Sequence, residues 1–181
     1  MAETASSTLA AWASFYVIIG SSGGALTGLM FVVITLVAGK GSRTTEEGIA
    51  TFSTPTVVHF CAALLVSAIL SVPWHSLGPA GVLVGLAGAC GLVFVVRAII
   101  RTSRLTTYRA DTEDWMWYTA LPGLAYVAII AGAIALQLVP VGALFVLAGA
   151  ALLLIFVGIH NAWDMVTYIA LNVIGVPPRD S

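Results

Sequence analysis

Residues 140–159 read PVGALFVLAGAALLLIFVGI and contain no charged or amide side chain. Because an α-helix rises about 1.5 Å per residue, this stretch is long enough to cross the roughly 30 Å hydrocarbon core of a bilayer. The uncharged region extends from Trp115 to Trp163, and residues 137–140, QLVP, mark a turn near its middle. We therefore predict two membrane-spanning helices in this region, at about residues 115–137 and 140–172.

Two further regions lack charged residues in the same way, Thr4–Gly39 and Gly48–Val96. The first is long enough for one spanning helix, and the second is long enough for two. Residues 73–79, PWHSLGP, carry Pro and Gly and mark a turn that divides the second region. Two hydroxyl side chains followed by proline, as in residues 53–55, are typical of a helix start. The three predicted helices cover residues 12–38, 55–74 and 79–101.

The composition agrees with a membrane protein and excludes several other classes. The chain is 60% hydrophobic and only 8% charged, and its mean hydropathy is +1.04. A soluble domain is about a quarter charged, and a disordered chain needs low hydrophobicity. Seven Lys and Arg residues against eight Asp and Glu residues provide no basic surface for nucleic acid. The sequence predicts an all-α integral membrane protein in which residues 1–181 form one transmembrane domain of five helices in the lipid bilayer.

The distribution of basic residues predicts the orientation of these helices. Lys and Arg concentrate in the cytoplasmic connections of membrane proteins. Here every basic residue falls near the end of a predicted helix on one side, in a connection on that side, or in the C-terminal tail, and the opposite side has none. We therefore expect the N-terminus outside, the C-terminus in the cytoplasm, and a location in a bacterial-type inner membrane. The basic residues are Lys40, Arg43, Arg97, Arg101, Arg104, Arg109 and Arg179.

A weak internal repeat relates two of the predicted helices. When the chain is shifted by 61 residues, positions 79–89 align with positions 140–150, and most of the aligned residues are identical. The repeat is compatible with a duplicated helical hairpin, in which the second and third predicted helices (55–74 and 79–101) correspond to the fourth and fifth (115–137 and 140–172). A shared richness in Gly, Ala, Leu and Val is the alternative cause of the matches.

Small residues recur at helical spacing on the predicted helices 12–38 and 79–101. Such faces allow close approach of helix backbones in lipid, which provides no hydrophobic drive for association. The faces can pack within one five-helix bundle, form the subunit interface of a homo-oligomer, or line a pore. The glycines concerned are Gly20, Gly24, Gly28, Gly81, Gly85 and Gly88.

A small set of polar residues is predicted to form one layer at the cytoplasmic end of the bundle. Helical rise places them at a similar depth, a few ångströms inside the membrane boundary. His160 and Asp164 are one helical turn apart on the same helix, so their side chains share a face. The five members of this polar layer are His59, Arg97, Asp114, His160 and Asp164.

Three interpretations of the polar layer are open from the sequence. It can be an interfacial polar shell, with a His160–Asp164 pair and an Arg97–Asp114 ion pair, since charges cost less at this depth than at the membrane centre. It can be the cytoplasmic gate of a channel, because rings of charged and His side chains select and gate permeant ions. It can also hold a metal or a haem through His59, His160 and Asp164, although no motif of tight ligand spacing is present.

Three other side chains give simpler expectations. Cys61 and Cys90 lie in apolar helix segments, where we expect buried, unreactive thiols without a disulfide. Pro122 lies within a predicted helix and should interrupt its backbone hydrogen bonding.

We predict from these observations an oligomeric channel or a permeation subunit for a small solute or ion. Motifs typical of hydrolases, kinases and nucleotide-binding enzymes are absent from the sequence, so we do not expect an enzyme. The sequence requires no cofactor. The alternatives are a metal- or haem-binding subunit of a redox or hydrolytic membrane system, and a non-catalytic accessory protein that binds other membrane proteins.

Overall fold

The computed structural model describes residues 7–38, 43–103 and 115–169, with side chains for 7–36, 54–100 and 115–167. The described residues are almost entirely helical, and no strand occurs among them. A short helical segment at residues 7–10 precedes the first long helix. The long helices are α2 (Ala13–Ala38), α3 (Arg43–Ser71), α4 (Leu77–Ser103), α6 (Leu121–Ala135) and α7 (Pro140–Ile169), and the π-helical turn η1 (Met116–Ala120) precedes α6.

Five stretches of these helices are long and apolar enough to cross a membrane. In one of them η1 and α6 together form a single span. The number of helices that are long and apolar enough to span therefore agrees with the prediction among the described residues, and the chain has the make-up of a multi-pass membrane protein. The spans are Ala13–Leu36, Thr54–Ser71, Leu77–Ile100, Met116–Ala135 and Pro140–Thr167.

The predicted start of the second helix is wrong, because α3 begins at Arg43 and contains Pro55 in its interior. A proline inside a helix removes one backbone hydrogen bond and kinks or breaks many helices. Spanning helices tolerate such prolines because neighbouring groups restore the lost bonding. The apolar part of the helix nevertheless begins at Thr54, close to the predicted position.

Pro122 is accommodated by a change of helix type. The N–H of Leu121 bonds to the carbonyl of Met116, five residues earlier, and this bond closes η1. Pro122 then lies in the first turn of α6, where a helix needs no donor from that residue. The predicted interruption of backbone bonding is therefore present, but it occurs as a π-helical turn just before the proline.

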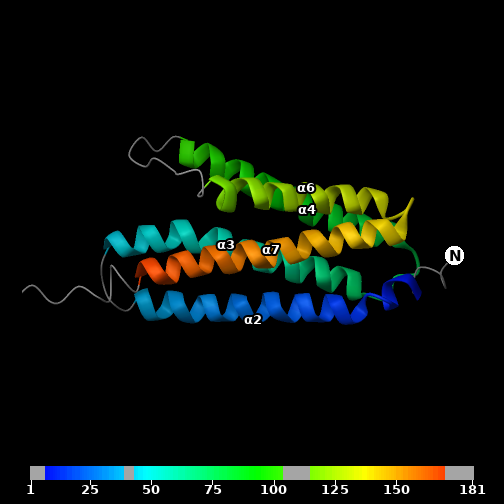
Figure 1. Ribbon diagram of the computed structural model, residues 1–181, viewed down its shortest axis with the longest axis horizontal. Helices are drawn as coiled ribbons and strands as arrows, with labels where there is room; N and C mark the ends of the chain where they lie inside the picture. Colours follow the sequence, from blue (N-terminus) through cyan, green and yellow to red (C-terminus); the bar gives the residue numbers. More distant parts are fainter. Residues whose placement is uncertain (1–6, 39–42, 104–114, 170–181) are drawn as a thin grey trace, which may run out of the picture.

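The five long helices run side by side along one axis (Figure 1). Helices α3, α7, α6 and α4 form a ring of four, in which α3 and α4 pack more loosely than the other neighbours. Helix α2 lies outside this ring against α3 and α7 (Figure 1). The turns between α3 and α4 and between α6 and α7 lie at the end of the bundle where α2 begins (Figure 1).

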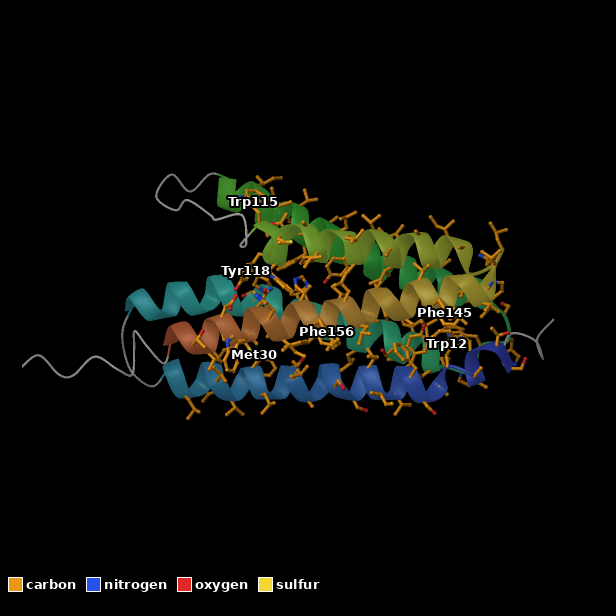
Figure 2. The ribbon with its side chains drawn as sticks, in the orientation of Figure 1. Trp12, Met30, Trp115, Tyr118, Phe145 and Phe156 are labelled. Carbon is orange, nitrogen blue, oxygen red and sulfur yellow. The ribbon has the colours of Figure 1, made fainter. Side chains whose placement is uncertain are left out.

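Aromatic side chains join α2 to α7 at that end of the bundle. Figure 2 shows Trp12 and Phe145 close together there, and their ring centroids are 4.7 Å apart in an edge-to-face arrangement. The Tyr16 hydroxyl, 1% exposed, donates to the carbonyl of Leu144 at 3.4 Å. These contacts fix α2 against the ring of four helices.

The predicted glycine faces pack mainly within the chain. A Cβ added at Gly20 would lie 3.2 Å from the Cβ of Ser67, which shows how closely α2 approaches α3. A Cβ at Gly88 would lie 2.9 Å from Ile129, so α4 approaches α6 as closely. Gly24, Gly81 and Gly85 make similar contacts, with Leu64 for the first and Ala133 for the other two. At Gly28, no atom of the described residues lies within 4 Å of an added Cβ.

Two glycines of α7 provide a matched test of this packing. Gly158→Ala should destabilise the fold by about 1–3 kcal/mol, because the added Cβ overlaps the buried ring of Phe60. Gly149→Ala should stabilise it by up to about 1 kcal/mol, because its Cβ meets open space and Ala favours a helix. Thermal unfolding of both variants in nanodiscs measures the difference. Equal changes in the two variants would contradict the described α3–α7 contact.

Candidate functional site

His59 and Tyr126 form a hydrogen bond in the interior of the bundle. The Nδ1 atom of His59 on α3 lies 2.9 Å from the hydroxyl oxygen of Tyr126 on α6. His59 is 1% exposed and Tyr126 is fully buried. Their ring centroids are 5.7 Å apart and the ring planes are tilted by 51°. The bond therefore ties two helices that are distant in the sequence.

Gly91 on α4 provides the space for the Tyr126 ring. A Cβ at this position would overlap the ring atoms of Tyr126, so the ring lies directly on the backbone of α4. This contact holds the aromatic ring while its hydroxyl reaches α3. One side chain of α6 thus connects three helices, and its position leaves it little freedom to move.

Asn161 on α7 is a second buried polar side chain. It is fully buried, and neither its Oδ1 nor its Nδ2 has a hydrogen-bond partner among the described residues. The Nε2 atom of His59 and the hydroxyl of Ser67 are buried without a partner in the same sense. A buried polar group without a hydrogen bond costs about 1–3 kcal/mol. Unpaired atoms inside membrane spans are therefore the most expensive polar features of the described structure.

The phenyl ring of Phe60 marks the depth of the two polar residues. Phe60 is fully buried, and its ring lies against Gly158 of α7, where a Cβ would overlap it. His59 is adjacent to Phe60 in α3, and Asn161 follows Gly158 by less than one helical turn. His59 and Asn161 therefore lie at a similar level on two helices that pack directly against each other.

His160 and Asp164 form the predicted pair on α7. His160 Nδ1 and Asp164 Oδ2 are 3.2 Å apart, which is within salt-bridge distance, but the two atoms lack the alignment of a hydrogen bond. The His160 ring also stacks on Trp117 of η1, with centroids 3.7 Å apart and an angle of 4° between the planes. Both members of the pair are partly exposed, so the contact lies at the edge of the bundle.

The other predicted contacts of the polar layer are only partly described. Arg97 is exposed on α4. Asp114 lies outside the described residues, so the ion pair Arg97–Asp114 stays a prediction. Among the described side chains, no group of three or more His, Cys, Asp or Glu residues is arranged to hold a metal ion. The proposed ligands His59, His160 and Asp164 thus form no ready three-ligand group, and the metal or haem site stays a prediction from the sequence.

The expected burial of the two cysteines is wrong. Cys61 and Cys90 are both exposed, free thiols. They line an apolar groove of about 640 Å³ between α3 and α4, together with Leu86, Phe94 and the ring of Tyr126. Apolar sequence does not predict burial in a spanning helix, since the side that faces lipid is as apolar as the side that faces protein.

The comparisons with known proteins do not extend this description. No family model, no curated protein and no solved structure matches the chain.

Tyr126, Asn161 and Trp117 contribute to the site but were not predicted to do so. Asn161 had the clearest available signal, because an amide inside an otherwise apolar helix is costly unless it has a role. Tyr126 and Trp117 had none, since aromatic residues are common in spanning helices and at their ends. The contacts of Tyr126 with His59 and of Trp117 with His160 are visible only in the three-dimensional arrangement.

The hydroxyl of Tyr126 should contribute measurably to stability. Tyr126→Phe leaves His59 Nδ1 buried without its partner and should destabilise the fold by about 1–3 kcal/mol. Tyr16→Phe is the matched control, because it removes a buried hydroxyl with a longer contact of 3.4 Å to a carbonyl. Thermal unfolding in nanodiscs should show the larger loss for Tyr126→Phe. A loss that is equal or smaller than that of Tyr16→Phe would count against the bond.

Proposed function

We propose that this protein is a small membrane permeation subunit, which conducts a small polar solute or ion and assembles as a homo-oligomer. The observation that supports this proposal is the burial of His59 and Asn161 inside the spans with unpartnered polar atoms. Membrane proteins rarely accept this cost, and polar residues within spans commonly mark the paths of solutes and ions.

The polar residues gather at one end of the spans. His59 lies five residues after Thr54, where the span of α3 starts, and Asn161 lies six residues before Thr167, where the span of α7 ends. Helical rise puts both about 8–9 Å inside the same end. We assign this end to the cytoplasm, because basic residues favour that side. Asp164 then lies closer to the cytoplasm than Asn161, its partner His160 lies at about the level of Asn161, and the pair forms the mouth of the path.

An apolar segment follows the polar end along α3. Phe60, Ala63 and Val66 are fully buried there, and Ser67 is the next buried polar residue. Ser67 follows His59 by eight positions, which corresponds to about 12 Å along the helix. Hydrophobic constrictions of this kind close pores by excluding water. In this proposal the described conformation is closed, and the apolar segment is the barrier between the two ends.

Among the glycines predicted for a subunit interface, Gly28 on α2 supports assembly into an oligomer. A Cβ added there would contact nothing within 4 Å. Since Gly28 lies within a span, another helix could approach its backbone closely from outside the bundle. The other glycines predicted for a subunit interface are used inside the bundle, so this support rests on fewer positions than the sequence suggested.

The permeation proposal predicts opposite results for two phenylalanine variants. Phe60→Leu shortens the buried ring in the apolar segment and should raise solute flux several-fold. Phe156→Leu changes a side chain that is 59% exposed on α7 (Figure 2) and should leave the flux unchanged. Stopped-flow light scattering with proteoliposomes, using glycerol, urea and potassium chloride gradients, measures the flux. If no solute crosses faster than through protein-free liposomes, for wild type and Phe60→Leu alike, the proposed function is wrong.

A further inference from the structure

We infer that His59 and Asn161 form a binding site for water, or for an uncharged hydrogen-bonding molecule of similar size, between α3, α6 and α7. The proposal deepens the permeation function, on which the role of this site in a pathway rests. Water occupancy itself is a property of the folded bundle and is measurable without any flux. The argument depends on three polar atoms and on the absence of charge among the buried described residues.

The bond to Tyr126 determines what His59 offers to a ligand. Among protein atoms of the described residues, His59 Nδ1 is an acceptor within reach of the Tyr126 hydroxyl, at 2.9 Å, and we assign the hydroxyl as the donor in this bond. In a neutral imidazole one ring nitrogen accepts and the other carries hydrogen. Nε2 therefore carries the hydrogen and presents a donor. The Tyr126 ring is held against Gly91 of α4, so its hydroxyl has a fixed position. The hydrogen bond from this hydroxyl in turn sets the orientation of the His59 imidazole.

Asn161 supplies the complementary groups. Its Oδ1 is an acceptor and its Nδ2 carries two donors, and all are unsatisfied by protein atoms of the described residues. Buried water molecules typically make about three hydrogen bonds to polar groups that would otherwise be unsatisfied. His59 Nε2, Asn161 Oδ1 and Asn161 Nδ2 provide that number. A single water molecule can donate to the amide oxygen and accept from both nitrogens.

The site is uncharged, which defines the class of ligand. The buried polar side chains of the described structure are Thr56, His59, Ser67 and Asn161, and none of them is acidic or is Lys or Arg. The side chains of the pair His160–Asp164 are 26% and 47% exposed, so neither belongs to this buried set. A small ion entering the site would lose its hydration without gaining a counter-charge. A neutral molecule with donors and acceptors loses much less.

The amino-acid composition makes this site accessible to selective labelling. The chain has three histidines and two asparagines, so ¹⁵N labelling of His and Asn yields few side-chain signals. Water-edited solid-state NMR of the labelled protein in lipid bilayers measures how fast magnetisation passes from water protons to each side chain. His75 in the exposed turn is the hydrated reference, and the backbone amide of ¹⁵N-labelled Phe60 is the dry reference.

The expected result is transfer to His59 Nε2 and Asn161 Nδ2 that approaches the rate at His75 and is several-fold faster than at the Phe60 amide. Transfer no faster than at the Phe60 amide would overturn the proposal. Asn161→Leu replaces the amide with an apolar side chain of similar size and should slow the transfer to His59 several-fold, while His75 stays unchanged. Unchanged transfer to His59 in a folded Asn161→Leu protein would show that the two residues do not share a ligand, and would overturn the shared site.

The flux measurement on the same proteoliposomes separates this proposal from the proposed function. Fast water transfer without solute flux would leave the binding site intact and refute permeation. Solute flux with a dry His59 and Asn161 would refute the binding site and leave permeation intact.

Discussion

The hydrocarbon core of a bilayer offers no hydrogen-bond partners, and this constraint governs the whole molecule. The backbone N–H and C=O groups must then find hydrogen-bond partners within the same segment. A single segment that spans the membrane therefore forms a helix. The five described spans meet this requirement, with one local change of bonding at η1. The same constraint makes any buried polar side chain expensive. The few that the described core contains therefore carry more information than the many apolar contacts around them.

The His59–Tyr126 hydrogen bond is the central example of such a side-chain contact. It joins α3 to α6, and the Tyr126 ring rests on Gly91 of α4. Next to His59 on α3, Phe60 packs on Gly158 of α7. Two adjacent residues of α3 thus contact two neighbouring helices, α6 through a polar bond and α7 through apolar packing, and Tyr126 extends the polar contact to α4. The unpaired Asn161 lies close to this junction, at the polar end of an otherwise apolar core.

The sequence was sufficient to predict the five spans, because long gaps between charged residues indicate spanning helices in a chain this hydrophobic. It was also sufficient for His160–Asp164, since a spacing of four residues on one helix fixes their proximity. Partners on different helices were not predictable in this way. A spanning helix is apolar on every side, so the pattern that separates core from surface in soluble proteins is missing. The exposed position of Cys61 and Cys90 and the packing of Tyr126 on Gly91 follow only from the assembled bundle.

The start of α3 was mispredicted for a different reason. A capping pattern before Pro55 indicates a helix start, but the same residues are compatible with a helix that continues through the proline. The glycine faces show a similar ambiguity. Spacing alone reveals that two backbones can approach, whereas the identity of the second helix depends on the tertiary structure. For Gly20 and Gly88 the second helix belongs to the same chain.

The most direct test of the central claim is the chemical accessibility of position 161. In a variant with Cys61 and Cys90 replaced by Ala, Asn161→Cys should react with methyl methanethiosulfonate, a small uncharged thiol reagent. Ala151→Cys, in the buried apolar core of the same helix, is the control and should stay unreactive. Labelling at position 161, with none at position 151, would support a polar site that water and small uncharged molecules reach. Absence of labelling at position 161, or equal labelling at both positions, would contradict the account.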